Sequence, residues 1–369
     1  MMLKIAIIGT RGIPNNYGGF EEISEYLSVG LVEKGHDITV YNSHNHPYKK
    51  KSWQGVKIVH QYDPEYLLGT SGQFIYDFNC ILHARRQNFD VILFMGYTSS
   101  SVWATLFPKN SVIISNMDGL EWKREKYSRP VQFFLKHAEK WAIKNSHYHI
   151  ADSQVIQSHL QKKYQLYCNY IPYGASVCSQ TDDSFLTHFG LTRQNYLLLI
   201  ARMEPENNVQ TILEGFHKSS STKKLAVIGN TANRMGSHML DKYQADPRII
   251  FLGSIFNKNI LDTFRAHCYL YFHGHSVGGT NPSLLEAMAG SALIAAHAND
   301  FNKAVLGKDA YYFSNSSEVK NLIEQIHCNG KEFNMVINNK QKIRTLYSWE
   351  KIINEYNEFI CRCYEQYHQ

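Results

Sequence analysis

The stretch 278–289, GGTNPSLLEAMA, combines a glycine-rich turn with the start of a helix. Asn281 suits the N-cap position and Pro282 the first helical position, because the N–H that proline lacks has no helical partner there. The amides of Ser283 and Leu284 would then be unpaired at the positive end of the helix dipole, an arrangement that binds phosphate. This pattern predicts an anion site.

Glu286 lies one turn further along the same helix, between apolar neighbours, where a charge without a role is unusual. Beside a phosphate site, its carboxylate could accept hydrogen bonds from the two hydroxyls of a ribose. Gly278 and Gly279 would let an anion approach the backbone closely. Together with Glu286, the helix start therefore predicts a nucleotide site.

A second glycine-rich segment, GTRGIPNNYGGFE (9–21), directly follows the first apolar run of the chain. Its four glycines and two asparagines suit positive-φ positions, and Arg11 can face an anion. The spacing matches neither the GxGxxG fingerprint nor a phosphate-binding P-loop. The alternative is a long loop without a function, although most β–α loops have only about 2–6 residues.

Two further polar residues follow predicted strands. Arg202 could clamp a diphosphate with two parallel hydrogen bonds, or it could pair with Glu204 or Glu206. Asp118 could act as a base or orient a sugar hydroxyl, or it could cap a helix. Taken alone, neither residue decides between these roles.

Short apolar runs rich in β-branched residues alternate with helical patterns, which is typical of doubly wound parallel sheets. The strands predicted in the first half are 3–8, 37–41, 91–95, 112–115 and 148–151, with helices at 21–34 and 130–144. Those predicted in the second half are 196–201, 224–229, 249–252, 269–273 and 292–296. The two series predict two sheets, with ligands beyond the carboxyl ends of the strands.

Apolar periodicity lapses between Gly174 and Leu191, and an amphipathic helix begins at Ser348. We therefore expect one domain over 1–185 and a second domain over 186–347, followed by a final helix at 348–369. If the two sheets face each other, the ligand site lies in the cleft between the domains.

The composition describes a folded globular protein, with 44% hydrophobic and 19% charged residues. The net charge of +6 is scattered along the chain, so nucleic acid is not expected as a partner, whereas anionic small molecules are. The run Lys123, Arg124 and Lys126 is typical of a solvated face. So are the lysines at 136, 140 and 144, although Phe133, Phe134 and Trp141 favour membrane-surface contact as a second interpretation.

Several classes of site are disfavoured because their residues are missing. The seven cysteines include no CxxC pair, which indicates free thiols in a reducing cytoplasm. No histidines have ligand spacing and no Asp-x-Asp pair occurs, so no metal site is expected. The Gly-x-Ser-x-Gly motif of hydrolases is absent. No apolar run approaches the roughly 20 residues of a spanning helix, which predicts a soluble or peripheral protein.

Taken together, the motifs resemble those of retaining glycosyltransferases of family 4, and more narrowly of the bacterial polysaccharide branch described as rhamnosyltransferases. The resemblance covers nearly the whole chain. The segments that carry it are GTRGIPNNYGGFEE, SNMDGLEWKREKY, ADSQVI, IPYGA, ARMEPENN and HGHSVGGTNPSLLEAMA. It implies the GT-B fold, an α/β architecture of two Rossmann-like domains with a final helix that crosses back to the N-terminal one.

The resemblance also implies roles for individual residues. Glu286 corresponds to the residue that binds the donor ribose, Arg202 to the one that stabilises the leaving diphosphate, and Asp118 to a position near the reacting sugar. The remaining donor-binding residues implied are Arg11, Gly18, Gly19, Asn207, Gly279, Thr280, Asn281, Ser283 and Leu284.

Two positions depart from the family pattern. Gly278 stands where the broader family has a glutamate that contacts the donor sugar, and Asn207 falls where a lysine is common. Loss of the glutamate removes a contact to a sugar hydroxyl, which makes a deoxy sugar such as rhamnose plausible. Both changes are also compatible with a weakened enzyme.

The function implied is that of a metal-independent, retaining hexosyltransferase without a cofactor. Its donor would be a dTDP, UDP or GDP sugar, and its acceptor a saccharide or lipid-linked saccharide of a capsule or O-antigen. The protein would act in the cytoplasm, or there at the inner face of the plasma membrane. The alternatives are a non-catalytic nucleotide-sugar-binding partner and a sugar-nucleotide epimerase.

Overall fold

In the computed structural model, residues 1–124, 127–178, 181–327 and 330–369 are described. Lys126 and Cys328, which enter the sequence argument, lie outside these ranges. The chain divides into two compact units. The first comprises residues 1–123, 127–174 and 349–369, and the second comprises 175–348 with the short segment 124–126.

The first unit is built on an eight-stranded sheet with the order β3-β4-β2-β1-β5-β6-β7-β8. All neighbouring strands are parallel except β3 and β4. The strands are β1 (Lys4–Ile8), β2 (Asp37–Ser43), β3 (Ser52–Trp53), β4 (Val56–Gln61), β5 (Val91–Met95), β6 (Val112–Asn116), β7 (Tyr148–Ala151) and β8 (Asn169–Tyr170).

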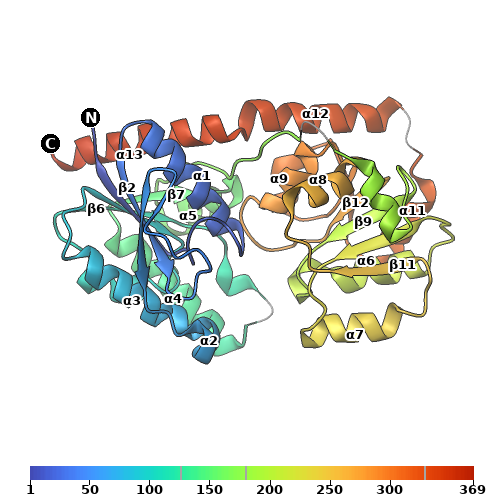
Figure 1. Cartoon of the computed structure of the whole chain (residues 1–369), viewed down its shortest axis with the longest axis horizontal. Helices are drawn as coiled ribbons and strands as arrows, with labels where there is room; N and C mark the ends of the chain where they lie inside the picture. Colours follow the sequence, from blue (N-terminus) through green and yellow to red (C-terminus); the bar gives the residue numbers. More distant parts are fainter. Residues whose placement is uncertain (125–126, 179–180, 328–329) are drawn as a thin grey trace. The chain divides into compact units, whose positions relative to one another are not determined.

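Helices cover both faces of this sheet (Figure 1). They are α1 (Gly19–Glu33), α2 (Glu65–Leu68), α3 (Gly72–Ala84), α4 (Arg129–Asn145), α5 (Gln154–Tyr164) and α13 (Trp349–Tyr367), with 3-10 turns at Gly69–Ser71, Ser101–Leu106 and Glu121–Lys123. Buried residues of β1, β5 and α3 form a continuous apolar core. The strands are apolar along their length because helices exclude water from both faces.

The final helix, α13, belongs to the first unit although it is last in sequence. It packs along α1, where the ring of Trp349 stacks on Tyr26 at 4.3 Å between centroids (Figure 1). A Cβ at Gly30 of α1 would lie 2.6 Å from Ile353, so glycine permits the close approach of the two helices. The predicted return of the final helix to the N-terminal domain is confirmed.

The second unit holds a six-stranded parallel sheet with the order β11-β10-β9-β12-β13-β14. Its strands are β9 (Tyr196–Ile200), β10 (Lys224–Ile228), β11 (Ile249–Gly253), β12 (Leu270–His273), β13 (Ile294–His297) and β14 (Tyr311–Phe313). Its helices are α6 (Val209–His217), α7 (Arg234–Tyr243), α8 (Lys258–His267), α9 (Pro282–Ala289), α10 (Asp300–Leu306), α11 (Ser316–Gln325) and α12 (Gly330–Leu346), with 3-10 turns at Asp183–Phe189 and Pro205–Asn207. Every strand and helix that we predicted is present, with ends that shift by one or two residues.

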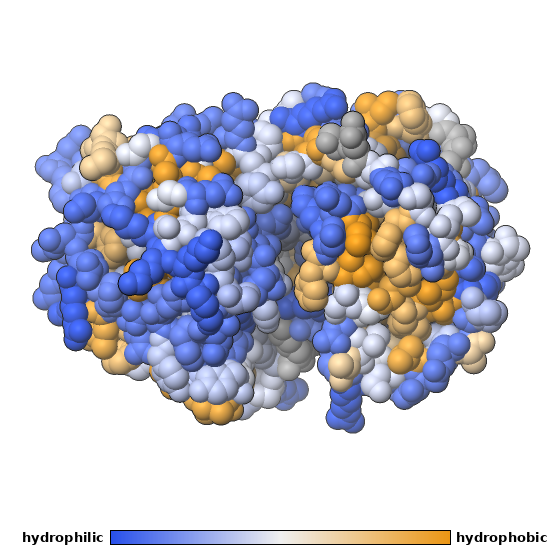
Figure 2. Space-filling model, viewed as in Figure 1, coloured by the Kyte–Doolittle hydropathy of each residue, from blue (hydrophilic) through white to orange (hydrophobic). Residues whose placement is uncertain are grey.

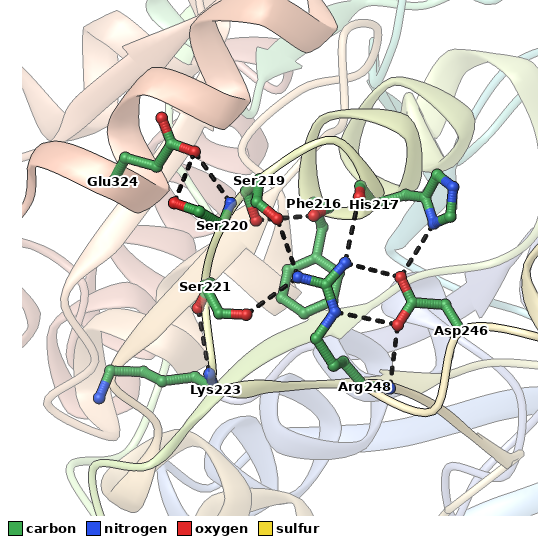
Figure 3. Close-up of polar contacts among 9 residues, drawn as sticks. All are labelled: Phe216, His217, Ser219, Ser220, Ser221, Lys223, Asp246, Arg248 and Glu324. Carbon is green, nitrogen blue, oxygen red and sulfur yellow. Dashed lines mark hydrogen bonds and ion pairs between the residues drawn. The ribbon is translucent and has the colours of Figure 1, made fainter.

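An arginine-centred cluster fixes the amino-terminal edge of this second sheet (Figure 3). Arg248 donates two hydrogen bonds to the carboxylate of Asp246, at 3.0 and 2.8 Å. Its guanidinium also donates to the carbonyls of His217, Ser219 and Ser221 and lies over the ring of Phe216. The hydrogen bonds from Arg248 hold the pKa of Asp246 below its ordinary value. Because the cluster precedes β10 and β11, its role is structural and remote from the opposite, ligand-binding edge.

None of the helices in the described ranges is long and apolar enough to cross a membrane. The six cysteines that the structure describes are all free thiols.

Candidate functional site

The polar residues of the second unit gather at the carboxyl edge of its sheet. β9 and β12 are neighbours, and β13 follows β12 in the sheet order. The loops that leave these strands carry Arg202, the glycines before α9, and the N-cap of α10. This is the edge at which open parallel sheets bind their ligands.

The loop after β12 is fastened to the loop after β9. The backbone N–H and the hydroxyl of Ser276 both donate to the carbonyl of Glu206, each at 2.9 Å. Asn208 donates from Nδ2 to the carbonyl of Gly274 at 2.8 Å. A Cβ at Gly274 would lie 2.0 Å from the carbonyl oxygen of Asn207, so only glycine permits this approach. The loops after β9 and β12 are therefore packed together as one structural unit.

Two asparagines hold the β12 loop from its other side. Nδ2 of Asn299 and Nδ2 of Asn302 each donate to the carbonyl of His275 at 2.9 Å. Asn299 is also the N-cap of α10, and Asn302 is buried. The chain leading into α9 is thus anchored both to β9 and to α10, which orders the start of the predicted site.

Asn281 caps α9 and Pro282 is the first helical residue, as predicted. The expectation that the next two amides are unpaired is wrong. The N–H of Ser283 donates to Oδ1 of Asn281, and the N–H of Leu284 donates to the carbonyl of Asn281, both at 3.0 Å. The short asparagine side chain reaches the Ser283 amide, and the backbone carbonyl of Asn281 accepts from the Leu284 amide. An anion at this helix start would have to share them or displace the cap.

Glu286 faces a buried arginine that the sequence analysis missed. Nη2 of Arg265 donates to Oε2 of Glu286, and Nη1 donates to Oδ1 of Asp262 at 3.2 Å. Arg265 is 1% exposed, and Nε has no partner within the part of the chain that the structure describes. The ion pair keeps Glu286 in a defined orientation, while a fifth of its side chain (21%) stays accessible. The sequence around Arg265 is an ordinary helical pattern, so nothing local indicates that this arginine pairs with Glu286.

Arg202 presents its guanidinium to solvent. Its side chain is 62% exposed and lies 3.9 Å from Glu204, a long ion pair that leaves the group available to another anion. Asn207, predicted to contact the donor, instead is buried and donates from Nδ2 to the carbonyl of Arg202 at 2.8 Å. The same carbonyl accepts from the backbone N–H of Glu204 at 2.8 Å, so the side chain of Asn207 adds a second hydrogen bond within the turn. Asn207 thereby fixes the backbone that carries Arg202.

The backbone of Gly278 has φ +145°, a conformation that side-chain-bearing residues rarely adopt. A Cβ there would meet nothing within 4 Å. Conformation rather than crowding therefore favours glycine at this position. Gly279 is half-buried beside it, and Thr280 is buried against the loop.

Three rings on alternate residues of β12 and the following loop stack beneath this region. His273 stacks on His275 at 4.5 Å between centroids and lies 6.3 Å from Tyr271. The hydroxyl of Tyr271 shares a hydrogen bond with the hydroxyl of Ser283 at 2.9 Å, which ties the rings to α9. Neither ring nitrogen of His273 has a partner among the described residues, and burial holds the pKa of His273 well below its ordinary value. The three stacked rings are therefore an uncharged layer that packs against the start of α9.

In the first unit, the glycine-rich loop is held tightly at its base. Asn42 accepts from the N–H of Ile13 at 3.1 Å and donates to its carbonyl at 2.8 Å. Tyr76 donates to the carbonyl of Thr10 at 3.0 Å. Gly9 has φ +93°, and a Cβ there would lie 2.6 Å from the carbonyl of Met95. The loop is therefore a rigid structure above β1 and β5.

Arg11 does not stand free to face an anion. Its Nε and Nη2 donate to the two carboxylate oxygens of Glu65 at 2.7 and 2.6 Å, and its guanidinium lies 3.8 Å above the ring centre of Tyr17. A bidentate carboxylate already satisfies the edge of the guanidinium that would bind a phosphate. We therefore correct its expected role: Arg11 ties the glycine-rich loop to α2.

Gly18 and Gly19 form the start of α1, with Gly18 at the N-cap in extended backbone geometry. Glu21, in the first turn, is buried and accepts from the N–H of Arg11 at 2.8 Å. This hydrogen bond fixes the start of α1 to the glycine-rich loop. Gly18 and Gly19 have no side chains, so the backbone at the carboxyl edge of the first sheet stays accessible.

Asp118 follows β6 at the same edge and is half-buried. The hydroxyl of Tyr97 donates to the carbonyl of the next residue, Gly119, at 3.3 Å. Burial, and then the negative charge of Asp118, raises the pKa of Tyr173 well above its ordinary value. Asp118 therefore lies close to buried tyrosine hydroxyls, a polar setting suited to holding a hydroxylated ligand.

The turn just beyond Asp118 is anchored through Trp122. Its indole N–H donates to Oε2 of Glu139 in α4 at 3.1 Å, and the other oxygen of Glu139 accepts from Lys163 at 2.8 Å. Burial acts against the charge of Glu139, but the hydrogen bonds from His159, Lys163 and Tyr164 lower its pKa to about 2. This ionised hub joins the Asp118 segment to α4 and α5.

Among the described residues, no group of three or more histidine, cysteine or acidic side chains is arranged to hold a metal ion.

Comparisons with known proteins address the fold of the chain. A family model described as a domain of unknown function, DUF1972, matches residues 2–176. No curated protein matches the sequence. The sucrose-phosphate synthase of Thermosynechococcus elongatus is 14% identical, with a TM-score of 0.83 over 99% of this chain and 100% of that chain.

Two other solved structures are similar over the whole length. Anabaena HepE in complex with UDP and glucose is 15% identical, with a TM-score of 0.74 over 98% of this chain and 100% of that chain. A glycosyltransferase from Rickettsia africae is 10% identical, with a TM-score of 0.69 over 98% of both chains. At such identities the likeness concerns the fold alone. The predicted fold class, GT-B with two parallel-sheet domains, is confirmed.

Proposed function

We propose that the protein is a glycosyltransferase that uses a nucleotide-sugar donor. The observation that carries the proposal is the carboxyl edge of the second sheet, where an exposed Arg202, the start of α9 and an oriented Glu286 stand on anchored loops. An accessible cation suits a diphosphate, and a fixed carboxylate suits the hydroxyls of a ribose. HepE, of the same fold, has been solved with UDP-glucose. The second unit is accordingly the donor domain and the first the acceptor domain.

The proposed reaction is a single transfer step. The bond between the anomeric carbon and the diphosphate oxygen breaks, and a bond from the acceptor hydroxyl oxygen to that carbon forms. Arg202 stabilises the charge on the departing diphosphate, which takes up the proton of the acceptor hydroxyl. Attack from the same face retains the anomeric configuration and needs neither a protein nucleophile nor a metal ion. Gly18, Gly19 and Asp118 hold the acceptor side of the reaction.

The identity of the sugar is a finer proposal. The backbone conformation at Gly278 disfavours the glutamate that related enzymes use to hold a sugar hydroxyl. We assign a deoxy hexose, such as rhamnose from dTDP-rhamnose, as the donor sugar. The acceptor is a lipid-linked precursor of a bacterial surface polysaccharide, reached at the inner face of the plasma membrane.

The first experiment is a thermal-shift panel of UDP, GDP and dTDP sugars on the purified protein. A ligand that binds only the folded state raises the melting temperature, by an increment that grows with concentration. We expect one nucleotide to stand out, and Glu286→Ala to bind it at least tenfold more weakly. If no nucleotide raises the melting temperature of the folded protein, the donor assignment is wrong.

A non-catalytic binding partner is the second candidate, because Asn207 turns inward where related enzymes often supply a lysine. Binding without transfer to any acceptor would favour it. Isomerisation of the donor without an acceptor would instead indicate an epimerase.

A further inference from the structure

The first unit carries a surface on which exposed apolar side chains and basic side chains lie together. We refer to it as the α2–α4 tip. Figure 2 shows hydrophobic atoms gathered at the lower tip of this unit, where Figure 1 places α2. Its exposed apolar residues are Tyr66, Leu67 and Leu68 of α2, Ile75 of α3, and Val131, Phe133 and Trp141 of α4.

These residues are linked through α3, whose first residue packs on α2 and whose Phe74 ring contacts α4. A Cβ at Gly72, the first residue of α3, would lie 2.5 Å from the backbone nitrogen of Glu65 in α2. The ring of Phe74 in α3 lies 5.6 Å from that of Phe134 in α4. Phe134 in turn lies 6.0 Å from Trp141. The apolar tip of α2 is therefore continuous with the exposed side of α4.

The charge on α4 has a single sign where it meets solvent. Arg129, Lys136, Lys140 and Lys144 are exposed, at spacings that place them with Phe133 along one side of the helix. All residues of α4 are described, and its one acid is Glu139, which is buried against Trp122 and Lys163. The exposed side of the helix is thus a basic stripe, with Phe133 between Arg129 and Lys136.

The acids of α2 and α3 do not offset this charge. Glu65 is bound bidentately by Arg11, and Asp77 is buried and accepts a hydrogen bond from Ser99 at 2.6 Å. On this surface, apolar side chains project between lysines, and no exposed acid lies among them. Such a surface is complementary to a lipid bilayer, which is anionic at its headgroups and apolar beneath them. A protein partner would more often present a groove or a mixed set of charges.

We infer that the α2–α4 tip docks the protein on an anionic lipid bilayer, with Leu67, Leu68 and Phe133 inserted among the headgroups and the α4 lysines on the lipid phosphates. The inference deepens the proposed function, because it assigns the surface that would bring the enzyme to a lipid-linked acceptor. It depends on that function only for this link, since vesicle binding needs neither donor nor transfer.

The test is co-sedimentation of the full chain with vesicles of phosphatidylcholine alone or with 30% phosphatidylglycerol by composition. We expect binding to the anionic vesicles, and a loss of at least tenfold when salt is raised, because ionic attraction to the surface is screened. Lys140→Glu with Lys144→Glu, and separately Leu67→Ser with Phe133→Ser, should each weaken binding about tenfold or more.

The chain offers a matched control. Phe333 in α12 has the same exposed fraction as Phe133, 67%, but belongs to the second unit. Phe333→Ser should leave vesicle binding unchanged. Circular dichroism of each variant checks that the exposed substitutions leave the fold intact.

Three results would overturn the inference: no sedimentation of the wild type with anionic vesicles at low salt, equal binding by the tip variants and wild type, or a dimer in light scattering that Phe133→Ser dissociates. The last would assign the surface to a second copy of the chain. A protein that binds vesicles but transfers no sugar would instead contradict the proposed function and leave the docking surface standing.

Discussion

At the scale of residues, the candidate donor site depends on groups that hold other groups in place. Glu286 is oriented by the buried Arg265, and the backbone of Arg202 is held by Asn207. Gly278 and Gly274 contribute through backbone geometry, one by its positive φ and the other by close packing. Side chains that bind a ligand can only act with precision when such supports are rigid.

Arg265→Met should weaken nucleoside diphosphate binding about tenfold or more. Removal of the guanidinium leaves Glu286 unpaired, and hydrogen bonds to charged groups contribute about 1.5–3 kcal/mol. Titration calorimetry with the tightest nucleotide of the panel measures the effect. Arg248→Met is the matched control, because this arginine also binds carboxylate and carbonyl oxygens but at the opposite edge of the sheet. It should lower the melting temperature and leave affinity unchanged; equal losses in both variants would refute the positioning role of Arg265.

Gly274→Ala should destabilise the second unit by about 1–3 kcal/mol, the usual cost of forcing extra volume into a packed site. The added methyl would press on the carbonyl of Asn207, 2.0 Å away, and separate the two loops that carry the site. Denaturant unfolding measures the change. Gly330→Ala, where nothing lies within 4 Å, should have little effect. Equal stability of the two variants would show that the loops are not closely packed.

At the scale of elements, the loops of the candidate site lie at the carboxyl edge of the second sheet, and a separate polar cluster lies at its amino edge. The Arg248 cluster closes the amino edge of the second sheet, whereas the carboxyl edge carries the stacked rings of β12 under α9. The buried ring of His273 is neutral in the folded state, since its pKa is well below the ordinary value. The free energy of unfolding of the second unit should therefore depend on pH through His273.

The sign of that dependence follows from the lowered pKa. Below about pH 6.5, His273 binds a proton in the unfolded chain but stays neutral in the folded protein. The free energy of unfolding therefore falls as the pH falls. The loss from His273 reaches about 1.4 kcal/mol by pH 5.5. We measure the free energy of unfolding in urea at pH 7.5 and 5.5. The decrease between these two pH values should be smaller in His273→Phe than in the wild type by that amount. An unchanged pH slope in His273→Phe would mean that the ring accepts a proton when folded.

At the scale of the whole molecule, the chain forms two sheet-based units and then returns to the first through α13. The stack of Trp349 on Tyr26 and the contact of Ile353 with Gly30 make this last helix part of the first unit's core. Helix formation alone would not hold it there, because most helical stability in proteins comes from packing of the apolar face.

Trp349→Ala should destabilise the first unit by about 3–5 kcal/mol, as for other large-to-small substitutions of buried aromatic residues. Hydrogen exchange should accelerate in α1 and α13 while the strands of the second sheet keep their protection. Phe333→Ala, at an exposed aromatic position, is the control and should change neither unit. Uniform acceleration across both sheets would contradict the assignment of α13 to one unit.

Strand–helix alternation was enough to predict both sheets, because buried parallel strands leave a strong apolar signal. The GT-B fold and the return of the final helix were instead implied by the resemblance of the motifs to a known family. The cap at Asn281 was also predictable from local chemistry. The partners of Arg11 and Glu286 were not, since Glu65 and Arg265 are distant in sequence and only the fold brings them close. The Ser283 and Leu284 amides were wrongly expected to be unpaired for a different, local reason: the side chain and the carbonyl of the Asn281 cap accept hydrogen bonds from them.

Transfer of a sugar from a nucleotide donor is tested most directly by mass spectrometry of an acceptor that has been incubated with the protein and the donor that it binds. The acceptor should gain the mass of one anhydro-sugar, with one nucleoside diphosphate released for each sugar transferred, and Glu286→Ala should abolish most of the product. A folded protein that binds the donor but leaves both donor and lipid-linked saccharide acceptors unchanged would contradict the claim.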